Sequence, residues 1–600
     1  MNRRNFMKSL ALTVVSAQLV YPKLLFAADS ADLATALQLQ LSGPGRVGFY
    51  IDYSELNGPG THTFYVCRTH GTQGTISVNY STGGDAHSNT NGTLTWADGE
   101  ADIKYFTVNV DSKSAGEHRI WALLGSPTGG AALHSGSLYT RAYGVIEDAT
   151  VASDNDAVFY DSAAASGGNG TQSSPYNNIY TAIAGLGSRR YLYGRGVTVP
   201  NTTNTTGAGG TARAPCIFMP PTRTGEDDRL YIRNWPGSSW EIDGQSSSSG
   251  AAGFYTNSGN SFITFRGIDF KNLDGTPTGT INGHAIMFFY GDSRGINIEL
   301  CSADNINGTA NNGAYQLWGV DGSKVWRSTS NNIQKQGDNA NGNTGGVYTY
   351  NGSNISVQRC EFSNSGNGVF HKRYAAGTVS TSVRFCIFEN TIHEAIHYST
   401  SGSGDPSHEY TIVQNNIIKS SLMGIDHNSG YNNSLHGIKH AWSNNIFDTV
   451  GWGLVAPIHF NEAFGAQIYN NIFVNCRRMW NETNNSSGIK TPGVEFANYN
   501  LDHGTTWYQK YGHSGNPYTG AELISATGHG GNDTTTDPLF SGDEYRLTQG
   551  SPAAAGGVNG ATQGVYLVGI EQIGVGEVGA VVESPYSKPQ PPSSITIRRI

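Results

Sequence analysis

The sequence predicts an all-β chain in which a small β-sandwich precedes a long solenoid of strands. Three observations support this prediction: short segments recur with a period of roughly 30 residues, they are rich in β-branched and aromatic side chains, and Gly- and Asn-rich turns separate them. The segments lack the apolar spacing that is typical of an amphipathic helix. A repeat of this kind indicates coils of strands that each pack on their neighbours.

The repeat is clearest in residues 354–475, where one small or uncharged side chain recurs on every coil. Counted with the upstream coils, successive occurrences are 26 to 33 residues apart by subtraction of their numbers. The residues at this position are Ile268, Cys301, Ser328, Cys360, Cys386, Asn416, Asn445 and Asn471. Because neighbouring strands lie ~4.8 Å apart, amides stacked at an inward corner can hydrogen-bond along the axis. We therefore expect an asparagine ladder inside the solenoid.

This ladder resembles that of the right-handed parallel β-helix proteins, the pectate-lyase-like superfamily and related carbohydrate-active proteins. A Gly- and Asn-rich loop at 167–171, a Ser-Pro-Tyr sequence and an expected short helix at 179–186 also resemble the usual opening of secreted members. A capping helix is needed there because the open end of a solenoid is an unpaired strand edge. The resemblance implies a β-helix over residues 149–580, followed by a Pro/Ser-rich tail at 581–600.

Residues 30–148 predict the β-sandwich. Alternating strands separated by turn residues occur at Thr75–Ser81, Gly92–Trp96, Tyr105–Val110 and His118–Leu124. The block from the first to the third of these strands resembles a Calx-beta domain. Such domains often bind Ca²⁺ through acidic residues near their last hairpin, but the corresponding turn here lacks a dense acidic cluster. The candidate oxygen ligands for Ca²⁺ are Asp98, Glu100 and Asp102.

Residues 1–28 predict a cleaved export signal. Arg3 and Arg4 precede an apolar run at 10–20 that is too short to span a membrane. The segment resembles a twin-arginine signal, and general secretory export remains the alternative. We therefore expect a periplasmic or extracellular protein without a membrane span.

The composition favours a folded, turn-rich extracellular protein. Glycine accounts for 78 of 600 residues, and 14 % of the residues are charged, against ~25 % in typical proteins. With 37 % hydrophobic residues the chain can build a core, which excludes general disorder. The net charge of −9 provides no overall basic field, so we expect no binding to nucleic acid. We also expect a monomer that binds an acidic polysaccharide. Lys372 and Arg373 would supply a local basic patch.

Six cysteines occur in the chain, and three of them lie in the ladder position. Two interpretations of Cys360 and Cys386 remain open, because these residues fall on adjacent coils. They form a disulfide, or they belong to a stack of buried thiols that act as small apolar side chains. No CxxC spacing typical of a metal site occurs, and Ca²⁺ is the one cofactor that the sequence suggests.

Chemically reactive residues recur on three consecutive coils. Histidines lie eleven residues after Cys360, Cys386 and Asn416, which predicts one column of imidazoles. The histidines and the reactive residues beside them are His371, Lys372, Arg373, Glu394, His397, Tyr398, Asp426 and His427. We treat these eight residues as candidate catalytic residues.

Two orientations of this column remain open, because side chains alternate between the two faces of a strand. If the apolar residues two positions before each histidine face inward, the histidines face inward too. The outward row is then Phe370, Lys372, Ile396, Tyr398, Asp426 and Asn428. If a bend resets the alternation, the outward residues are His371, Arg373, His397 and His427.

The residue set suits cleavage of a uronic-acid polysaccharide by β-elimination. Elimination needs a base for the C5 proton, an acid for the leaving oxygen, and cationic groups at the substrate carboxylate. Lysine or histidine can act as the base, tyrosine or histidine as the acid, and an arginine as the carboxylate clamp. The sequence GVFHKRY at 368–374 resembles the lysine-bearing coil of some β-helix polysaccharide lyases, which implies Lys372 as the base.

Two other functions remain open. A β-helix glycoside hydrolase would use Glu394 and Asp426 as paired carboxylates, with His397 or His427 assisting. A non-catalytic glycan-binding or adhesin-like solenoid would instead bury or salt-bridge the histidines and Lys372. The aromatic residues that are candidates for stacking on sugar rings are Trp318, Tyr348, Tyr350, Tyr374, Tyr431 and Trp480.

Overall fold

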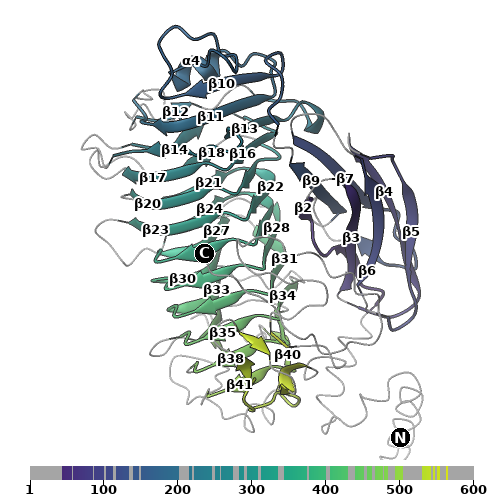
Figure 1. Cartoon of the computed structure of the whole chain (residues 1–600). Helices are drawn as coiled ribbons and strands as arrows, with labels where there is room; N and C mark the ends of the chain where they lie inside the picture. Colours follow the sequence, from purple (N-terminus) through teal and green to yellow (C-terminus); the bar gives the residue numbers. More distant parts are fainter. Residues whose placement is uncertain are drawn as a thin grey trace, which may run out of the picture.

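The computed structural model shows an all-β chain in which a β-sandwich precedes a parallel β-helix, as the sequence predicts (Figure 1). The residues that it describes are 43–56, 59–69, 71–84, 87–100, 103–111, 117–133, 140–147, 150–201, 215–218, 222–245, 251–256, 259–274, 283–288, 293–308, 312–335, 343–373, 377–400, 406–429, 439–451, 456–461, 466–476, 479–483, 494–504, 530–541, 545–547, 551–554 and 563–564. The predicted export signal and the predicted tail lie outside these ranges. Among the described residues, no helix has both the length and the apolar character needed to cross a bilayer.

The sandwich consists of a four-stranded sheet in the order β6-β3-β1-β8 and a five-stranded sheet in the order β2-β9-β7-β4-β5. The strands are β1 (Arg46–Phe49), β2 (Tyr53–Leu56), β3 (Gly60–Thr69), β4 (Ile76–Gly84), β5 (Asn91–Trp96), β6 (Lys104–Val110), β7 (Glu117–Gly125), β8 (Ala132–Leu133) and β9 (Arg141–Glu147). The four strands expected from the sequence correspond to β4, β5, β6 and β7. Alternating residues of the two sheets form one apolar core, in which Phe64 stacks on Phe106 at 5.3 Å between ring centroids.

The solenoid has three parallel faces, and each face receives one strand from successive coils. The first face contains β10 (Ala157–Asp161), β11 (Tyr191–Thr198), β13 (Leu230–Asn234), β16 (Ile263–Arg266), β19 (Asn297–Glu299), β22 (Asp321–Trp326), β25 (Ser353–Gln358), β28 (Gly377–Arg384), β31 (Pro406–Gln414), β34 (Lys439–Ser443), β37 (Ala466–Tyr469) and β40 (Val494–Asn498). The second face contains β14 (Trp240–Asp243), β17 (Asp269–Asp274), β20 (Ser302–Gly308), β23 (Thr329–Lys335), β26 (Glu361–Ser363), β29 (Ile387–Glu389), β32 (Ile417–Lys419), β35 (Ile446–Asp448), β38 (Ile472–Val474) and β41 (Leu501–His503). The third face contains β12 (Ile217–Phe218), β15 (Phe254–Thr256), β18 (Ile286–Phe288), β21 (Asn312–Trp318), β24 (Thr344–Tyr350), β27 (Asn367–Arg373), β30 (Glu394–Thr400), β33 (Met423–Ser429), β36 (Ile458–Asn461) and β39 (Trp480–Thr483).

The predicted capping helix is α4 (Ile179–Ala184), which lies at the first end of the solenoid (Figure 1). The Asn178 side chain caps it by accepting hydrogen bonds from the backbone N–H groups of Tyr180 and Thr181, at 2.9 and 3.2 Å. Ile179 and Ala182 face the core and cover its open end. Beyond β41, a short hairpin of β42 (Phe540–Ser541) and β43 (Arg546–Leu547) follows.

The asparagine ladder is confirmed at the corner between the first and second faces. Asn416 donates through Nδ2 to Asn445 Oδ1 at 3.0 Å, and Asn445 donates likewise to Asn471 Oδ1 at 3.1 Å. The ladder extends one coil further than predicted, because Asn471 also donates to Asn500 Oδ1 at 3.1 Å. These amides are buried, so each bond satisfies a polar group that has no access to water.

The cysteines follow the buried-thiol interpretation. All six are free and buried. The Cys360 and Cys386 thiols each donate to the backbone carbonyl two residues earlier, at 3.3 and 3.2 Å. The alternative of a disulfide between them is therefore wrong for this structure.

The sandwich packs on the outer side of the first face (Figure 1). Tyr53 lies against Trp326 with 4.9 Å between ring centroids, and Asp52 forms a buried ion pair with Lys324. A second buried ion pair joins Arg119 Nη2 to Glu299 Oε1 at 3.0 Å. Because leaving one buried charge without its partner is costly, these contacts hold the sandwich in one position on the solenoid.

Candidate active site on the third face

The third face carries a column of outward side chains that crosses five coils. Strand register places Tyr348, Phe370, His397, Asp426 and His459 opposite one another on consecutive strands. The residue before each of them is a branched apolar side chain buried in the solenoid core. Alternation therefore directs this column away from the core.

The predicted column of three histidines is wrong at its middle member. His371 and His427 lie opposite Tyr398, whereas His397 lies opposite Phe370 and Asp426. The turn before β30 holds one residue more than the turns before β27 and β33. Shifting a strand by one residue moves every side chain to the other face.

The same shift corrects the predicted outward row. Phe370, Lys372 and Asp426 face outward as expected. Ile396 and Tyr398 instead belong to the core cluster and are inaccessible to solvent. The side chain of Asn428 lies outside the described residues.

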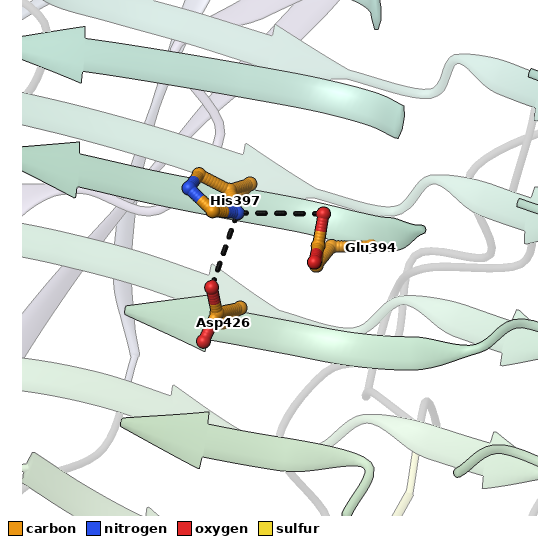
Figure 2. A group of neighbouring side chains, drawn as sticks. All are labelled: Glu394, His397 and Asp426. Atoms are coloured by element: carbon orange, nitrogen blue, oxygen red, sulfur yellow. Dashed lines mark ion pairs between the residues drawn. The ribbon is translucent and has the colours of Figure 1, made fainter. Parts of the chain in front are cut away.

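Glu394, His397 and Asp426 come together on the outward side (Figure 2). His397 Nδ1 lies 3.1 Å from Asp426 Oδ2 and 3.4 Å from Glu394 Oε2. Ala395 and Ile396 both lie in the core, so the alternation of side chains is interrupted between them. Glu394, which precedes Ala395, therefore faces the outward side together with His397. The Glu394 backbone N–H is held by Asn367 Oδ1 at 3.1 Å.

His459 extends the cluster by one coil. Its Nδ1 lies 2.5 Å from Asp426 Oδ1, so the two carboxylate oxygens of Asp426 contact two different imidazoles. The side chains of His397 and His459 are 13 % and 17 % exposed, whereas that of Asp426 is 5 % exposed. The imidazoles therefore reach solvent at a point where the central carboxylate does not.

The electrostatics of the cluster favour an ionised carboxylate and a charged imidazole. Burial by itself lowers the pKa of His397, but the Glu394 and Asp426 carboxylates outweigh burial and raise the pKa to about 10. Burial also disfavours the charged form of Asp426, yet the adjacent imidazoles of His397 and His459 hold its pKa below the usual range. The Asp426 carboxylate and the charged His397 imidazole therefore stabilise each other in a region that is largely shielded from solvent.

Lys372 occupies the next outward position on β27, two residues beyond Phe370. With ~4.8 Å between strands and ~3.3 Å per residue, its Cα lies roughly 8 Å diagonally from that of His397. The side chain is partly buried, and burial lowers the pKa of its amine. Lys372 forms no ion pair with any residue that the structure describes.

Arg373 does not share this surface equally with Lys372. It is 7 % exposed, and its Nη1 donates to the Asn351 carbonyl at 3.4 Å. Burial lowers the pKa of its guanidinium as well. The predicted basic patch is therefore centred on Lys372.

His371, Tyr398 and His427 lie inside the solenoid and form an inward column with Thr349. Thr349 Oγ1 hydrogen-bonds His371 Nδ1, and the Tyr398 ring lies 6.1 and 6.2 Å from the two imidazoles. Burial lowers the pKa of His371 to about 3 and that of His427 to about 4, and it raises the pKa of Tyr398. These side chains lie apart from the outward cluster, and the inward interpretation is correct for both histidines.

His459 was missed by counting from the ladder position. The turn before β36 is longer than its predecessors, so an offset of eleven residues from Asn445 falls on Ala456. Alignment on the branched residue of each strand would have found it. Ile396-His397, Ile425-Asp426 and Ile458-His459 then fall in one register.

The aromatic residues on this face pack mainly on each other. Tyr348 stacks on Phe370 at 5.0 Å, and Phe370 stacks on His397 at 4.7 Å with 19° between the ring planes. Trp318 and Tyr348 are buried, so the prediction that they stack on sugars is wrong, whereas Tyr350 is partly exposed. Tyr374, Tyr431 and the side chain of Trp480 lie outside the described residues.

The acidic residues suggested as calcium ligands in the sandwich make local contacts. Asp98 Oδ1 accepts a hydrogen bond from the Gly74 N–H at 2.6 Å, and Glu100 Oε2 accepts one from the Ala97 N–H at 2.8 Å. Glu100 also pairs with Lys104. Asp102 lies outside the described residues, and Ca²⁺ binding to the sandwich stays a prediction.

Comparisons with known proteins give structural likeness only. No protein-family model and no curated protein matches the chain. Among solved structures, the apo form of the Calx CBD1 domain is similar at 17 % identity and a TM-score of 0.16, covering 17 % of this chain and 97 % of that one. The Calx CBD2 domain has the same identity, TM-score and share of this chain, with 86 % of that chain covered.

Proposed function

We propose that this chain is an exported enzyme that cleaves a uronic-acid-containing polysaccharide by β-elimination. The observation that supports this proposal most is the position of Lys372. Its partly buried amine forms no ion pair with the described residues. It lies on the same outward face as the contacting side chains of His397, Asp426 and His459. A base and a set of proton-bearing groups thus occupy adjacent positions on one rigid sheet.

The elimination assigns a separate task to each group. The neutral amine of Lys372 removes the C5 proton, the C4–C5 double bond forms, and the bond from C4 to the glycosidic oxygen breaks. Burial favours the neutral amine, because desolvation penalises its charged form. The leaving oxygen takes a proton from His397 Nε2, because His397 lies on the strand next to Lys372 and only its Nδ1 faces the two carboxylates.

The orientation of His397 is fixed for this proton transfer. Its ring is oriented by Phe370 on one side and by two carboxylates at Nδ1, and its second nitrogen points away from both carboxylates (Figure 2). Charge that develops on the leaving oxygen in the transition state is stabilised by a donor already fixed in place.

Hydrolysis is the second candidate, because one observation favours it. One oxygen of Glu394 and one of Asp426 lie within 4.8 Å of each other, so the two carboxylates are close enough to act as a pair, as in retaining glycosidases. Asp426, with its lowered pKa, would be the nucleophile and Glu394 the acid. Hydrolysis would then need neither Lys372 nor a uronic acid.

Incubation of the purified protein with a panel of uronic-acid polysaccharides tests the two candidates together. Elimination gives an unsaturated product with a characteristic ultraviolet absorbance, and we expect Lys372→Ala to lower its rate by roughly 10²–10⁴-fold. Lys271→Ala is the matched control, because Lys271 lies on the second face and pairs with Glu241. New reducing ends without that absorbance would establish hydrolysis, and neither signal would leave a glycan-binding solenoid.

A further inference from the structure

We propose that Glu394, His397 and Asp426 bind one divalent transition-metal ion, with His459 beside them. The three side chains bring two carboxylate oxygens and one imidazole nitrogen within 4.8 Å of one another. They come from two adjacent strands, β30 and β33, of one rigid sheet. The cluster mixes imidazole with carboxylate, which distinguishes it from an ordinary group of surface acids.

The two distances from His397 Nδ1 to the carboxylate oxygens match those between ligands of a bound ion. Ligands ~2.1 Å from a metal are separated by roughly 3.0 Å in octahedral geometry and roughly 3.4 Å in tetrahedral geometry. His397 Nδ1 lies 3.1 Å from Asp426 Oδ2 and 3.4 Å from Glu394 Oε2. Both distances fall in this range, and the ligand oxygens of Glu394 and Asp426 lie within 4.8 Å of each other.

The orientation of the His397 ring supports the same conclusion. Two carboxylate oxygens approach Nδ1, yet neither is positioned for a well-aligned hydrogen bond from that nitrogen. A single proton on Nδ1 can serve at most one of them well. A metal on the lone-pair axis of Nδ1 would have the two oxygens beside that axis rather than on it, which suits this arrangement.

Neighbouring residues hold the donor groups in place. Phe370 stacks on the His397 ring, and Asn367 holds the backbone of Glu394. His459 Nδ1 contacts the Asp426 oxygen that does not face His397. Such outer contacts orient the ligands of metal sites, and their loss typically costs 10–100-fold in metal affinity.

The donor set selects a class of metal. Imidazole together with carboxylate suits Zn²⁺, Mn²⁺, Fe²⁺ or Ni²⁺, whereas Ca²⁺ and Mg²⁺ prefer oxygen ligands alone. Three protein ligands leave coordination positions open for solvent or substrate. If the proposed elimination is correct, an oxygen of the uronate carboxylate would take one of these positions.

Direct binding to the purified chain tests the site without any substrate. After treatment with a chelator, we expect titration calorimetry to show one tight site for Zn²⁺ or Mn²⁺ and weaker binding of Ca²⁺ at the same site. His397→Ala and Asp426→Asn should each weaken the binding at least 100-fold. His503→Ala is the matched control, since His503 lies on β41 of the second face and should not change the affinity.

Several outcomes would overturn the proposal. They are no transition-metal binding, binding that His397→Ala leaves unchanged, or a Co²⁺-loaded protein whose absorption spectrum is the same with and without His397. If Asp426→Asn fails to fold in a thermal melt, Glu394→Gln provides the second ligand variant. Metal bound in a protein that cleaves no polysaccharide would refute the proposed elimination and leave the metal site intact.

Discussion

Histidines lie on both the inner and the outer side of the third face, but with opposite charge states. His371 and His427 lie in the core, where burial lowers their pKa values to about 3 and about 4. His397 lies on the outside, where two carboxylates raise its pKa to about 10. The inner pair fills space as neutral rings, while the outer imidazole is part of a charged cluster. Strand alternation alone separates the two roles, so a shift of one residue would exchange them.

Removal of the central carboxylate should have the largest effect. Asp426→Ala leaves His397 with Glu394 only and removes the partner of His459, so we expect activity on the polysaccharide to fall roughly 10²–10⁴-fold. Breaking a buried charge pair should also lower the free energy of unfolding by about 3–5 kcal/mol, measured by urea denaturation. Asp269→Asn on the second face is the control, and equal losses in both variants would show that the cluster has no special role.

The inner histidines should make the fold sensitive to acid. Their unfolded pKa is ~6.5, so below that pH the unfolded chain binds protons that the folded core excludes, and stability falls by ~1.4 kcal/mol per pH unit for each histidine. His62 in the sandwich contributes in the same direction, because burial lowers its pKa to about 4. Urea denaturation between pH 6.5 and 4.5 should show this slope, and His427→Gln should reduce it by about a third.

His62→Gln provides the control for that experiment. It should reduce the acid slope by a similar amount without changing activity, since His62 packs against Phe64 in the sandwich, away from the third face. An unchanged slope in His427→Gln would mean that His427 is charged in the folded state, contrary to its buried position.

The outer histidine should make the metal-free fold sensitive to alkali. Above pH 6.5 the unfolded chain loses a proton that folded His397 keeps until about pH 10, so stability falls as the pH rises through this window, by ~1.4 kcal/mol per unit. His397→Gln should remove this contribution and leave the acid slope intact. A wild-type protein whose stability is constant from pH 7 to 9 would contradict a charged His397.

Loosening the stack beneath His397 should have the smallest effect. Phe370→Leu keeps the apolar contact but removes the ring that lies parallel to the imidazole, so the expected loss of stability is about 0.5–1.5 kcal/mol. Zn²⁺ affinity should fall about 10-fold, as for other contacts that orient a ligand. Phe362→Leu, inside the core, is the comparison: it should lower stability without changing metal affinity.

The fold was predictable because its signals are local and repeated. The ladder residues Asn416, Asn445 and Asn471 recur at the same place in similar strand sequences, and each must bury an amide that only its neighbours can satisfy. The capping helix α4 and the strands of the sandwich follow from equally local patterns. None of these features depends on the exact length of a turn.

The site was predictable only in part, because it depends on turn lengths. The predicted proximity of Glu394 and Asp426 on neighbouring coils is confirmed. His397 was assigned to the wrong column, and His459 was missed, because turns before β30 and β36 hold additional residues. A fixed offset counted from the ladder position ignores these additional residues, so it points to the wrong residue of the next strand.

By itself, the sequence determined that this chain stacks coils of strands around a ladder and that reactive residues gather on three of them. Only the tertiary structure decided which of those residues face the surface. The core accepts Ile396, Ile425 and Ile458 at the same position on successive coils, because branched apolar side chains pack there with no contact with water. The buried isoleucines fix the register of each strand whatever the length of the turn before it. The residue after each isoleucine therefore faces outward and joins the cluster.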